Sequence, residues 1–349
     1  MDLPSGIRNY TYDRDMAIFR TKTHWTMLLI LFVILGTLPL YIDNHWLSVA
    51  NLIGITIIAA TGLNILIGYC GQLSIGHAGF IAVGAYTSAV LTNRLELPFL
   101  VGLISAGLLS GFMGVIFGIP SVRVKGFYLA ISTIAAQIII IWIINHWDSV
   151  TGGFNGIVVP PAKIAGITFI SQGSQFYLII GIAILVIFFA KNLARTRVGR
   201  AFIAIRDNDL AAEVMGINLF RYKLLAFFIG CFLAGIAGSL LAHWIGFMNT
   251  ENFRLTESIL YVGIIIIGGL GSTIGPILGV IFIRLLEKGI SFLAPTLEST
   301  FDLPAGFTTG IGPMIFGIVI ILFLILEPRG LAHRWQLFKA SYRLWPFSY

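Results

Sequence analysis

Residues 47–67 read LSVANLIGITIIAATGLNILI and contain no charged side chain. A helix rises 1.5 Å per residue, so about 20 apolar residues cross the roughly 30 Å of hydrocarbon in a bilayer. Runs of this kind recur along the 349 residues, of which 57% are hydrophobic and 11% are charged. An ordinary soluble domain carries about a quarter charged residues, so the sequence predicts a chain that folds inside a lipid bilayer.

Ten apolar segments alternate with short polar joints. They are 25–41, 47–67, 73–92, 99–119, 127–144, 176–190, 224–246, 258–267, 274–290 and 311–326. Backbone groups in lipid must hydrogen-bond internally, and the runs lack the alternation of a barrel strand, so each is expected to be helical. The sequence therefore predicts an all-α, polytopic transmembrane bundle of ten spans, some of them short or interrupted by glycine.

Basic residues gather in joints that an even number of spans would place on one side of the membrane. Most of the 22 Lys and Arg lie before residue 25, in the joint 120–126, in the loop 191–223 and after residue 327. Cytoplasmic loops carry such an excess, which explains the net charge of +7 without invoking nucleic acid. The predicted parts are a cytoplasmic tail (1–24), a transmembrane domain (25–327) with an external loop (145–175) and a cytoplasmic loop (191–223), and a cytoplasmic C-terminal tail (328–349).

A short helix is expected inside the cytoplasmic loop, from Asp207 to Met215. Asp207 or Asn208 can cap its start, and Gly216 can end it in the left-handed conformation. A short helix held between two spans is suited to docking another protein. An ordinary solvated connector explains the same pattern equally well.

Residues 197–218, RVGRAFIAIRDNDLAAEVMGIN, resemble the coupling loop in permease subunits of branched-chain amino acid ABC importers, the LivM type. Further stretches agree with that family: GLNILIGYCGQLSIGHAGFIAVGAY (62–86), TGGFNGI (151–157), GGLGSTIGPILGV (268–280) and EPRGL (327–331). The resemblance covers residues 47–331. It implies a multi-pass protein of the bacterial inner membrane that carries branched-chain amino acids or related small solutes such as amides and urea.

The chain has no G-x-x-x-x-G-K-[ST] phosphate loop, so the energy for transport must come from another chain. The resemblance implies two ATP-binding cassette ATPase subunits holding ATP and Mg, a distinct second permease subunit and a soluble substrate-binding protein. No cofactor and no enzymatic activity are expected of this chain itself. The residues expected to couple to an ATPase are Arg200, Arg206, Asp207, Asp209, Ala212, Glu213 and Gly216.

Glycines interrupt the apolar stretch 62–86 and predict a broken helix there. Irregular backbone at membrane depth survives only where protein covers it or where it lines a cavity. An offset of 200 residues aligns three of these glycines with three later ones, and paired glycine-interrupted segments are typical of a translocation site. The aligned pairs are Gly68 with Gly268, Gly71 with Gly271, and Gly79 with Gly279. Close helix packing is the alternative, as for the G-x-x-x-G pair Gly107 and Gly111.

Two polar clusters are the candidates for the substrate pathway. Gly71, Gln72, Ser74, Gly76 and His77 form the first cluster, and Thr151, Gly152, Gly153, Asn155 and Gly156 form the second. The second cluster lies in TGGFNGI, which is expected to be a tight external turn near the substrate entrance. His77 taken alone is expected to be structural rather than a ligand.

Arg284 and Glu287 stand near the ninth apolar segment, one helical turn apart. A self-neutralised structural pair is favoured there over a substrate site. A secondary transporter would need carboxylates deep in its spans, and a channel would need a selectivity filter. A membrane enzyme would need a nucleophile or a metal cluster. The six histidines are dispersed, so no metal site is predicted. The remaining alternatives are a permease of the same superfamily for a sugar, nucleoside or autoinducer, and an ATPase-independent channel.

Overall fold

The computed structural model describes residues 22–120, 126–164, 166–301 and 307–344. Residues 1–21 of the predicted N-terminal tail lie outside the described residues. The long helices are α2 (Lys22–Tyr41), α3 (Asn44–Asn64), α4 (His77–Asn93), α5 (Phe99–Gly118), α6 (Phe127–His146), α8 (Gln172–Arg195), α11 (Leu219–Ile245), α12 (Leu255–Gly268), α13 (Gly275–Phe301) and α14 (Phe307–Leu326). The short ones are η1 (Ile65–Tyr69), α7 (Asp148–Thr151), η3 (Gly153–Asn155), α9 (Arg197–Asp207), α10 (Asp209–Val214), η4 (Thr250–Phe253) and α15 (Leu331–Leu344).

Strands are limited to two short antiparallel pairs among the described residues. β1 (Ile157–Val158) pairs with β4 (Phe247–Met248), and β2 (Lys163–Ile164) pairs with β3 (Ile167–Thr168). The prediction of an all-α chain is confirmed. The predicted C-terminal tail contains the helix α15, and the predicted external loop contains α7, η3 and the first three strands.

A helix covers each of the predicted apolar segments, with one displaced boundary. The segment predicted to begin at Leu73 becomes helical only at His77, because residues 70–76 are not helical. The π-helix η1 and this non-helical stretch together form the break that the glycines predicted.

Among the described residues, five helices are long and apolar enough to cross a membrane: α3 with η1, α5, α6, α8 and α11. The residues 314–326 of α14 and 331–341 of α15 meet at 45° and would add a sixth if the bent pair were one span. The helix 25–41 is apolar but shorter. The chain is therefore a polytopic membrane protein, and the number of ten spans stays a prediction.

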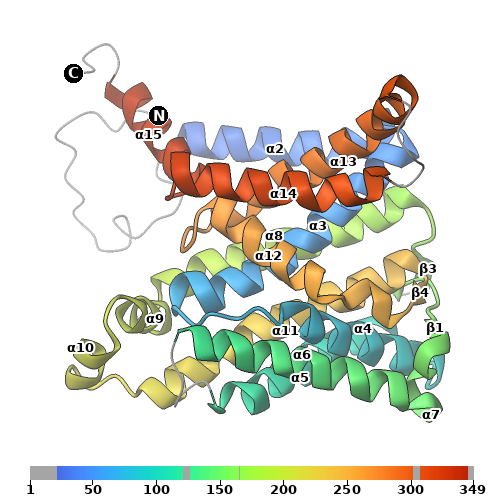
Figure 1. Ribbon diagram of the computed structural model, residues 1–349. Helices are drawn as coiled ribbons and strands as arrows, with labels where there is room; N and C mark the ends of the chain where they lie inside the picture. Colours follow the sequence, from blue (N-terminus) through green and yellow to red (C-terminus); the bar gives the residue numbers. More distant parts are fainter. Residues whose placement is uncertain (1–21, 121–125, 165, 302–306, 345–349) are drawn as a thin grey trace.

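The long helices lie roughly side by side, as Figure 1 shows, and the short elements gather at the two ends of the bundle. The helices α9 and α10 project at one end, on the left of the view. The elements α7, β1, β3 and β4 lie at the opposite end, on the right. The predicted cytoplasmic and external loops thus occupy opposite ends of the molecule.

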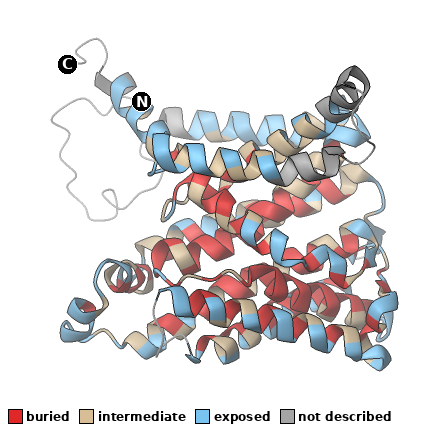
Figure 2. Ribbon diagram, viewed as in Figure 1, coloured by how far each residue is buried: buried red, intermediate tan, exposed pale blue. Residues whose placement is uncertain are grey.

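The core lies between α3, α4, α5 and α11, where Figure 2 shows most of the buried residues. The apolar window of α3 with η1 is 83% buried, whereas that of α8 is 33% buried, so α3 is central and α8 peripheral. Glycines allow α5 to approach α11 closely. A Cβ atom on Gly107 would lie 2.8 Å from the Phe232 ring, and one on Gly111 would lie 2.9 Å from the Phe228 ring. The predicted G-x-x-x-G packing is confirmed at this pair.

Candidate functional site

The loop 191–223 folds into two capped helices. The Asn208 side chain accepts a hydrogen bond from the Ala211 N–H at 3.1 Å and caps α10, and Gly216 follows with a φ of 84°. The predicted short helix is confirmed, with Asn208 rather than Asp207 as its cap. The helix α9 was not predicted. Its signal was present in Thr196, which caps it through the Gly199 N–H, and in the apolar spacing of Val198, Phe202 and Ile205.

The helix α10 turns apolar side chains away from the protein. Leu210, Val214 and Met215 are 66%, 87% and 82% exposed. A short helix is normally stabilised by burying an apolar face. Because this face of α10 is exposed, another chain can pack against it. Of the residues predicted to couple to an ATPase, five are exposed, Asp209 is half-buried and Ala212 is buried. The exposed residues are Arg200, Arg206, Asp207, Glu213 and Gly216, and the Arg206 side chain reaches back to the Gly68 carbonyl oxygen.

Arg206 connects the loop to the glycine-rich break after α3. Its Nη1 donates to the Gly68 carbonyl oxygen at 2.8 Å, and its Nε donates to Asp207 Oδ1 at 3.0 Å. A Cβ atom on Gly71 would lie 3.1 Å from Arg206 Cγ, so a side chain there would crowd the arginine. A charge-assisted hydrogen bond of this kind is stronger than a neutral one, so it ties α9 to this break.

The glycine breaks after α3 and after α12 pack against each other. The Asn64 Oδ1 accepts from the Gly271 N–H at 3.0 Å, and its Nδ2 donates to the Ser272 carbonyl at 2.9 Å. A Cβ atom on Gly68 would lie 2.5 Å from the Gly271 nitrogen. The paired Gly71 and Gly271 both adopt positive φ, 70° and 74°. The aligned segments therefore share a contact and a local conformation, and Arg206 stands beside both.

The predicted cluster 71–77 is mostly buried between helices. His77 Nε2 donates to the Ala59 carbonyl oxygen at 2.9 Å, and the His77 ring packs edge-on against Tyr261 at 5.9 Å between ring centroids. A Cβ atom on Gly76 would clash with the Thr133 carbonyl oxygen. Among the described residues, the buried Ser74 Oγ and His77 Nδ1 have no hydrogen-bond partner. The structure thus brings Gln72, Ser74, Gly76 and His77 together inside the helices, with Gly71 exposed at their edge.

The TGGFNGI segment forms the tight turn that the sequence predicts. Thr151 Oγ1 donates to the Ile144 carbonyl at 2.6 Å, and it accepts from the Gly153 N–H at 3.2 Å. Gly152, Gly153 and Gly156 have positive φ, and Asn155 is exposed. The turn leads into β1, which pairs with β4.

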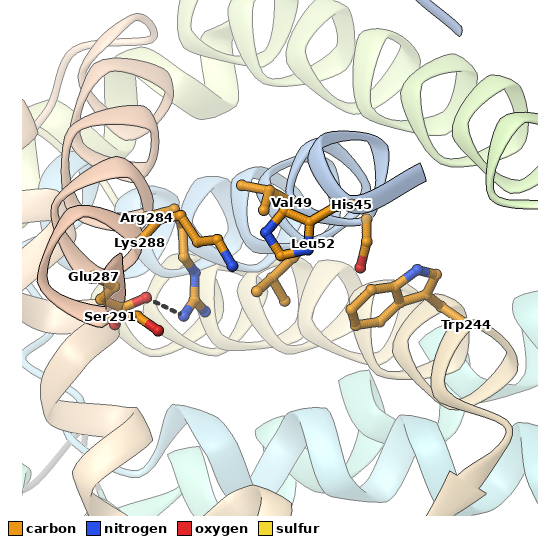
Figure 3. Close-up of a pocket in the computed structure, with 9 residues that line it drawn as sticks. His45, Val49, Leu52, Trp244, Arg284, Glu287, Lys288 and Ser291 are labelled. Carbon is orange, nitrogen blue, oxygen red and sulfur yellow. Dashed lines mark hydrogen bonds and ion pairs between the residues drawn. The ribbon is translucent and has the colours of Figure 1, made fainter. Parts of the chain in front are cut away.

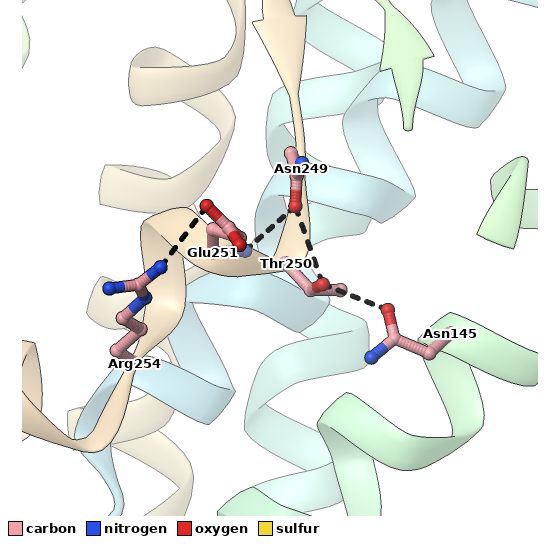
Figure 4. Close-up of polar contacts among 5 residues, drawn as sticks. All are labelled: Asn145, Asn249, Thr250, Glu251 and Arg254. Carbon is pink, nitrogen blue, oxygen red and sulfur yellow. Dashed lines mark hydrogen bonds and ion pairs between the residues drawn. The ribbon is translucent and has the colours of Figure 1, made fainter. Parts of the chain in front are cut away.

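The segment after β4 is tied to the same region. Thr250 Oγ1 donates to Asn145 Oδ1 at 2.8 Å, and Asn249 Oδ1 accepts from the Glu251 N–H at 2.8 Å (Figure 4). Glu251 pairs with Arg254 across 3.1 Å. The TGGFNGI turn and the connection to α12 therefore form one hydrogen-bonded unit. The two clusters predicted for the substrate pathway lie in different parts of the fold. The cluster 71–77 lies between helices, whereas this turn makes its hydrogen bonds with α6 and β4.

A cavity of about 270 Å³ opens between α3, α11 and α13 (Figure 3). Arg284 Nη1 donates to Glu287 Oε2 at 2.8 Å, and Arg284 Nε donates to Thr56 Oγ1 at 3.2 Å. The predicted Arg284–Glu287 pair is confirmed. A second cavity of about 290 Å³ adjoins the first, with Leu52, Trp244 and Arg284 in both linings and Glu257 in the second. Sequence reasoning missed Glu257. Its signal was a carboxylate directly before the apolar segment 258–267.

Comparison with known proteins places these features in a family. A family model described as "Branched-chain amino acid transport system / permease component" matches residues 46–325. The protein named "High-affinity branched-chain amino acid transport system permease protein LivM" in Salmonella typhimurium is 33% identical over 281 residues, covering 73% of this chain and 66% of that protein. The protein of the same name in Escherichia coli K12 is 33% identical over 294 residues, covering 77% and 68%.

A third relative is named for a different solute. The "Autoinducer 2 import system permease protein LsrC" of Enterobacter sp. strain 638 is 27% identical over 259 residues, covering 71% of this chain and 67% of that protein. This chain therefore spans about two thirds of the length of each of these three relatives. No solved structure matches it.

Proposed function

Because this chain belongs to the family of branched-chain amino acid transport system permease components, we propose that it forms part of the path by which an ABC importer moves branched-chain amino acids across a membrane. Two ATP-binding cassette subunits that hold ATP and Mg drive the transport. A second, distinct permease subunit completes the path, and a soluble binding protein delivers the substrate. The complex resides in the bacterial inner membrane.

The observation that carries the proposal is the construction of the loop 191–223. The helix α10 presents Leu210, Val214 and Met215 to the outside, and α9 connects through Arg206 to the break at Gly68. An ATPase subunit that packs on α10 can therefore pull on the glycine breaks without touching them. Motion that begins at the ATPase reaches the glycine breaks by this route.

The topology is a further part of the proposal. Ten crossings put both termini in the cytoplasm, together with the basic loop 191–223. In support, α9 and α10 lie at the end of the bundle opposite β1 and β4, and a helix covers each apolar segment. The cytoplasmic tails of this topology are 1–24 and 328–349.

Uptake of radiolabelled leucine into proteoliposomes tests the proposal. The complete complex is reconstituted with ATP inside, and the wild type is compared with Val214→Asp combined with Met215→Asp. Two carboxylates on the docking face are costly to bury against a partner, so uptake is expected to fall by about tenfold or more. Val158→Asp, which changes a similarly exposed apolar residue on β1, is the matched control and is expected to leave uptake near the wild-type rate.

Leucine uptake that persists without ATPase subunits would contradict the ABC mechanism and favour a channel or a secondary transporter. The LsrC relative supports a second candidate, in which the same mechanism imports an autoinducer or a sugar-like solute. ATP-dependent uptake of such a solute, with no uptake of leucine, would establish that candidate instead.

A further inference from the structure

Charged side chains of both signs meet in the two adjoining cavities between α3, α11, α12 and α13. Arg284 on α13 borders both cavities, and its side chain is only 11% exposed. Glu257, on the first turn of α12, borders the second. Ionisable groups within membrane-spanning helices are costly, so they are paired or they serve a function.

The pairing in the cavities is incomplete. Arg284 and Glu287 neutralise each other across 2.8 Å. Within the described residues the Glu257 carboxylate makes no hydrogen bond or ion pair, although it lines the second cavity together with Arg284. Tyr261 lies one turn further along α12 and lines the second cavity as well. A half-buried carboxylate close to a guanidinium, but not bonded to it, leaves room for a molecule that contacts both.

Apolar surface surrounds these charges. Leu52 and Trp244 line both cavities, and Ile55 and Ile81 line the second. A cavity of about 150 Å³ holds a benzene-sized molecule, so a volume of about 270 Å³ has room for a small amino acid. A cavity with a cationic group, an anionic group and an apolar wall matches a solute that carries both charges beside a hydrocarbon side chain.

We propose that the joined cavities are a transient binding site for an α-amino acid zwitterion. The Arg284 guanidinium binds the carboxylate of the solute, the Glu257 carboxylate binds its ammonium, and Leu52, Ile55 and Trp244 pack against its side chain. The inference rests on the proposed import function and assigns the site within this chain that recognises the charged groups. A neutral sugar-like solute gains nothing from two opposite charges, because burying them without partners is costly.

Protection of an introduced thiol tests the site directly. Ser48 lines the first cavity, and the chain's two cysteines, Cys70 and Cys231, are both buried, so Ser48→Cys supplies the one accessible thiol. The full complex in proteoliposomes is treated with a charged thiol reagent from outside, with or without leucine. Leucine is expected to slow labelling, whereas leucinamide, 4-methylpentanoate and ribose are expected to protect much less, because each lacks one or both charges.

Three variants in the Ser48→Cys background identify the groups. Glu257→Gln and Arg284→Gln are each expected to raise the leucine concentration needed for protection by about tenfold or more, the effect of losing one charge-assisted hydrogen bond. Glu257→Asp keeps the charge and is expected to retain most of the protection, which a merely structural role for Glu257 would not predict. Asp43→Asn removes an exposed carboxylate that precedes α3 and is the matched control, expected to leave protection unchanged.

ATP-dependent leucine uptake, measured in the same vesicles, separates the two proposals. If the wild type takes up leucine but leucine, leucinamide, 4-methylpentanoate and ribose protect the thiol equally, the zwitterion site is overturned and the import function stands. The same holds if Glu257→Gln leaves the protection by leucine unchanged. No leucine uptake by the wild type, together with uptake of a neutral solute, overturns both.

Discussion

The two large loops of the molecule are built in different ways. The loop 145–175, predicted to be external, is tied to its surroundings by the β1–β4 pair, by Thr151 and by the Asn145–Thr250 hydrogen bond. The loop 191–223, predicted to be cytoplasmic, contains α9 and α10, whose caps come from the loop's own side chains. Its described contacts with the protein body include the Arg206–Gly68 hydrogen bond and the burial of Phe202 and Ile205 in the core.

This difference indicates what each loop needs from a partner. The external turn satisfies its own backbone with neighbouring elements, so its shape does not depend on another chain. The loop 191–223 packs Phe202 and Ile205 of α9 into the core but leaves Leu210, Val214 and Met215 of α10 exposed, which fits a helix whose packing is completed by another protein. Three substitutions test the comparison.

The largest expected effect is that of Gly156→Ala in the external turn. Gly156 has a φ of 73°, and a Cβ atom there would clash with the Met248 carbonyl oxygen. The strained backbone and the clash with the β4 backbone together are expected to cost about 3 kcal/mol of stability. Thermal unfolding of the purified complex, followed by fluorescence, measures the loss. An unchanged melting temperature would show that the external turn yields as easily as an open loop.

A smaller effect is expected for Arg206→Ala, and on coupling rather than stability. Loss of the charge-assisted bond to the Gly68 carbonyl is expected to cost about 2 kcal/mol, so leucine uptake per ATP hydrolysed should fall by about tenfold or more. Arg197→Ala removes an exposed arginine at the start of α9 and is the matched control, expected to retain the wild-type ratio. Equal ratios in both variants would mean that Arg206 does not connect the loop to the glycine break.

The smallest effect is expected for Gly216→Ala, the counterpart of Gly156→Ala. Gly216 has a φ of 84°, but a Cβ atom at this position would meet no other atom within 4 Å. Only the backbone conformation is penalised, so the expected cost is about 1 kcal/mol. The same melting measurement, run beside Gly156→Ala, isolates the contribution of crowding. A loss as large as that of Gly156→Ala would contradict the contrast between the loops.

The sequence predicted the helices and their order well because each apolar segment is long and uninterrupted by charge. It predicted α10 because Asn208 and Gly216 are local signals that do not depend on the rest of the fold. It also predicted the Arg284–Glu287 pair, which one turn of a single helix brings together. Such features are decided within a few neighbouring residues.

Contacts between distant segments could not be derived in this way. The Arg206–Gly68 bond joins residues 138 positions apart, and Glu257 reaches the Arg284 cavity only because α12 and α13 pack beside α3. The 200-residue offset pointed to two related glycine segments, but nothing in it indicated that Asn64 would bind the second break directly. The helix α9 was missed because its arginines were counted as loop charge, although its apolar residues follow helical spacing.

The π-helix η1 has a mechanical consequence. The Cys70 N–H donates to the Ile65 carbonyl five residues earlier, one residue more than an α-turn contains. Successive residues of an α-helix are about 100° apart around the axis, so conversion of η1 to α-helix would rotate everything that follows by about that angle. The segment after η1 leads to His77 and α4, and Arg206 holds η1 at the Gly68 carbonyl. The π-helix thus contains one residue more than an α-helical turn, and a change between the two forms would alter the direction of the following segment. Arg206 binds the backbone at the place where that change would occur.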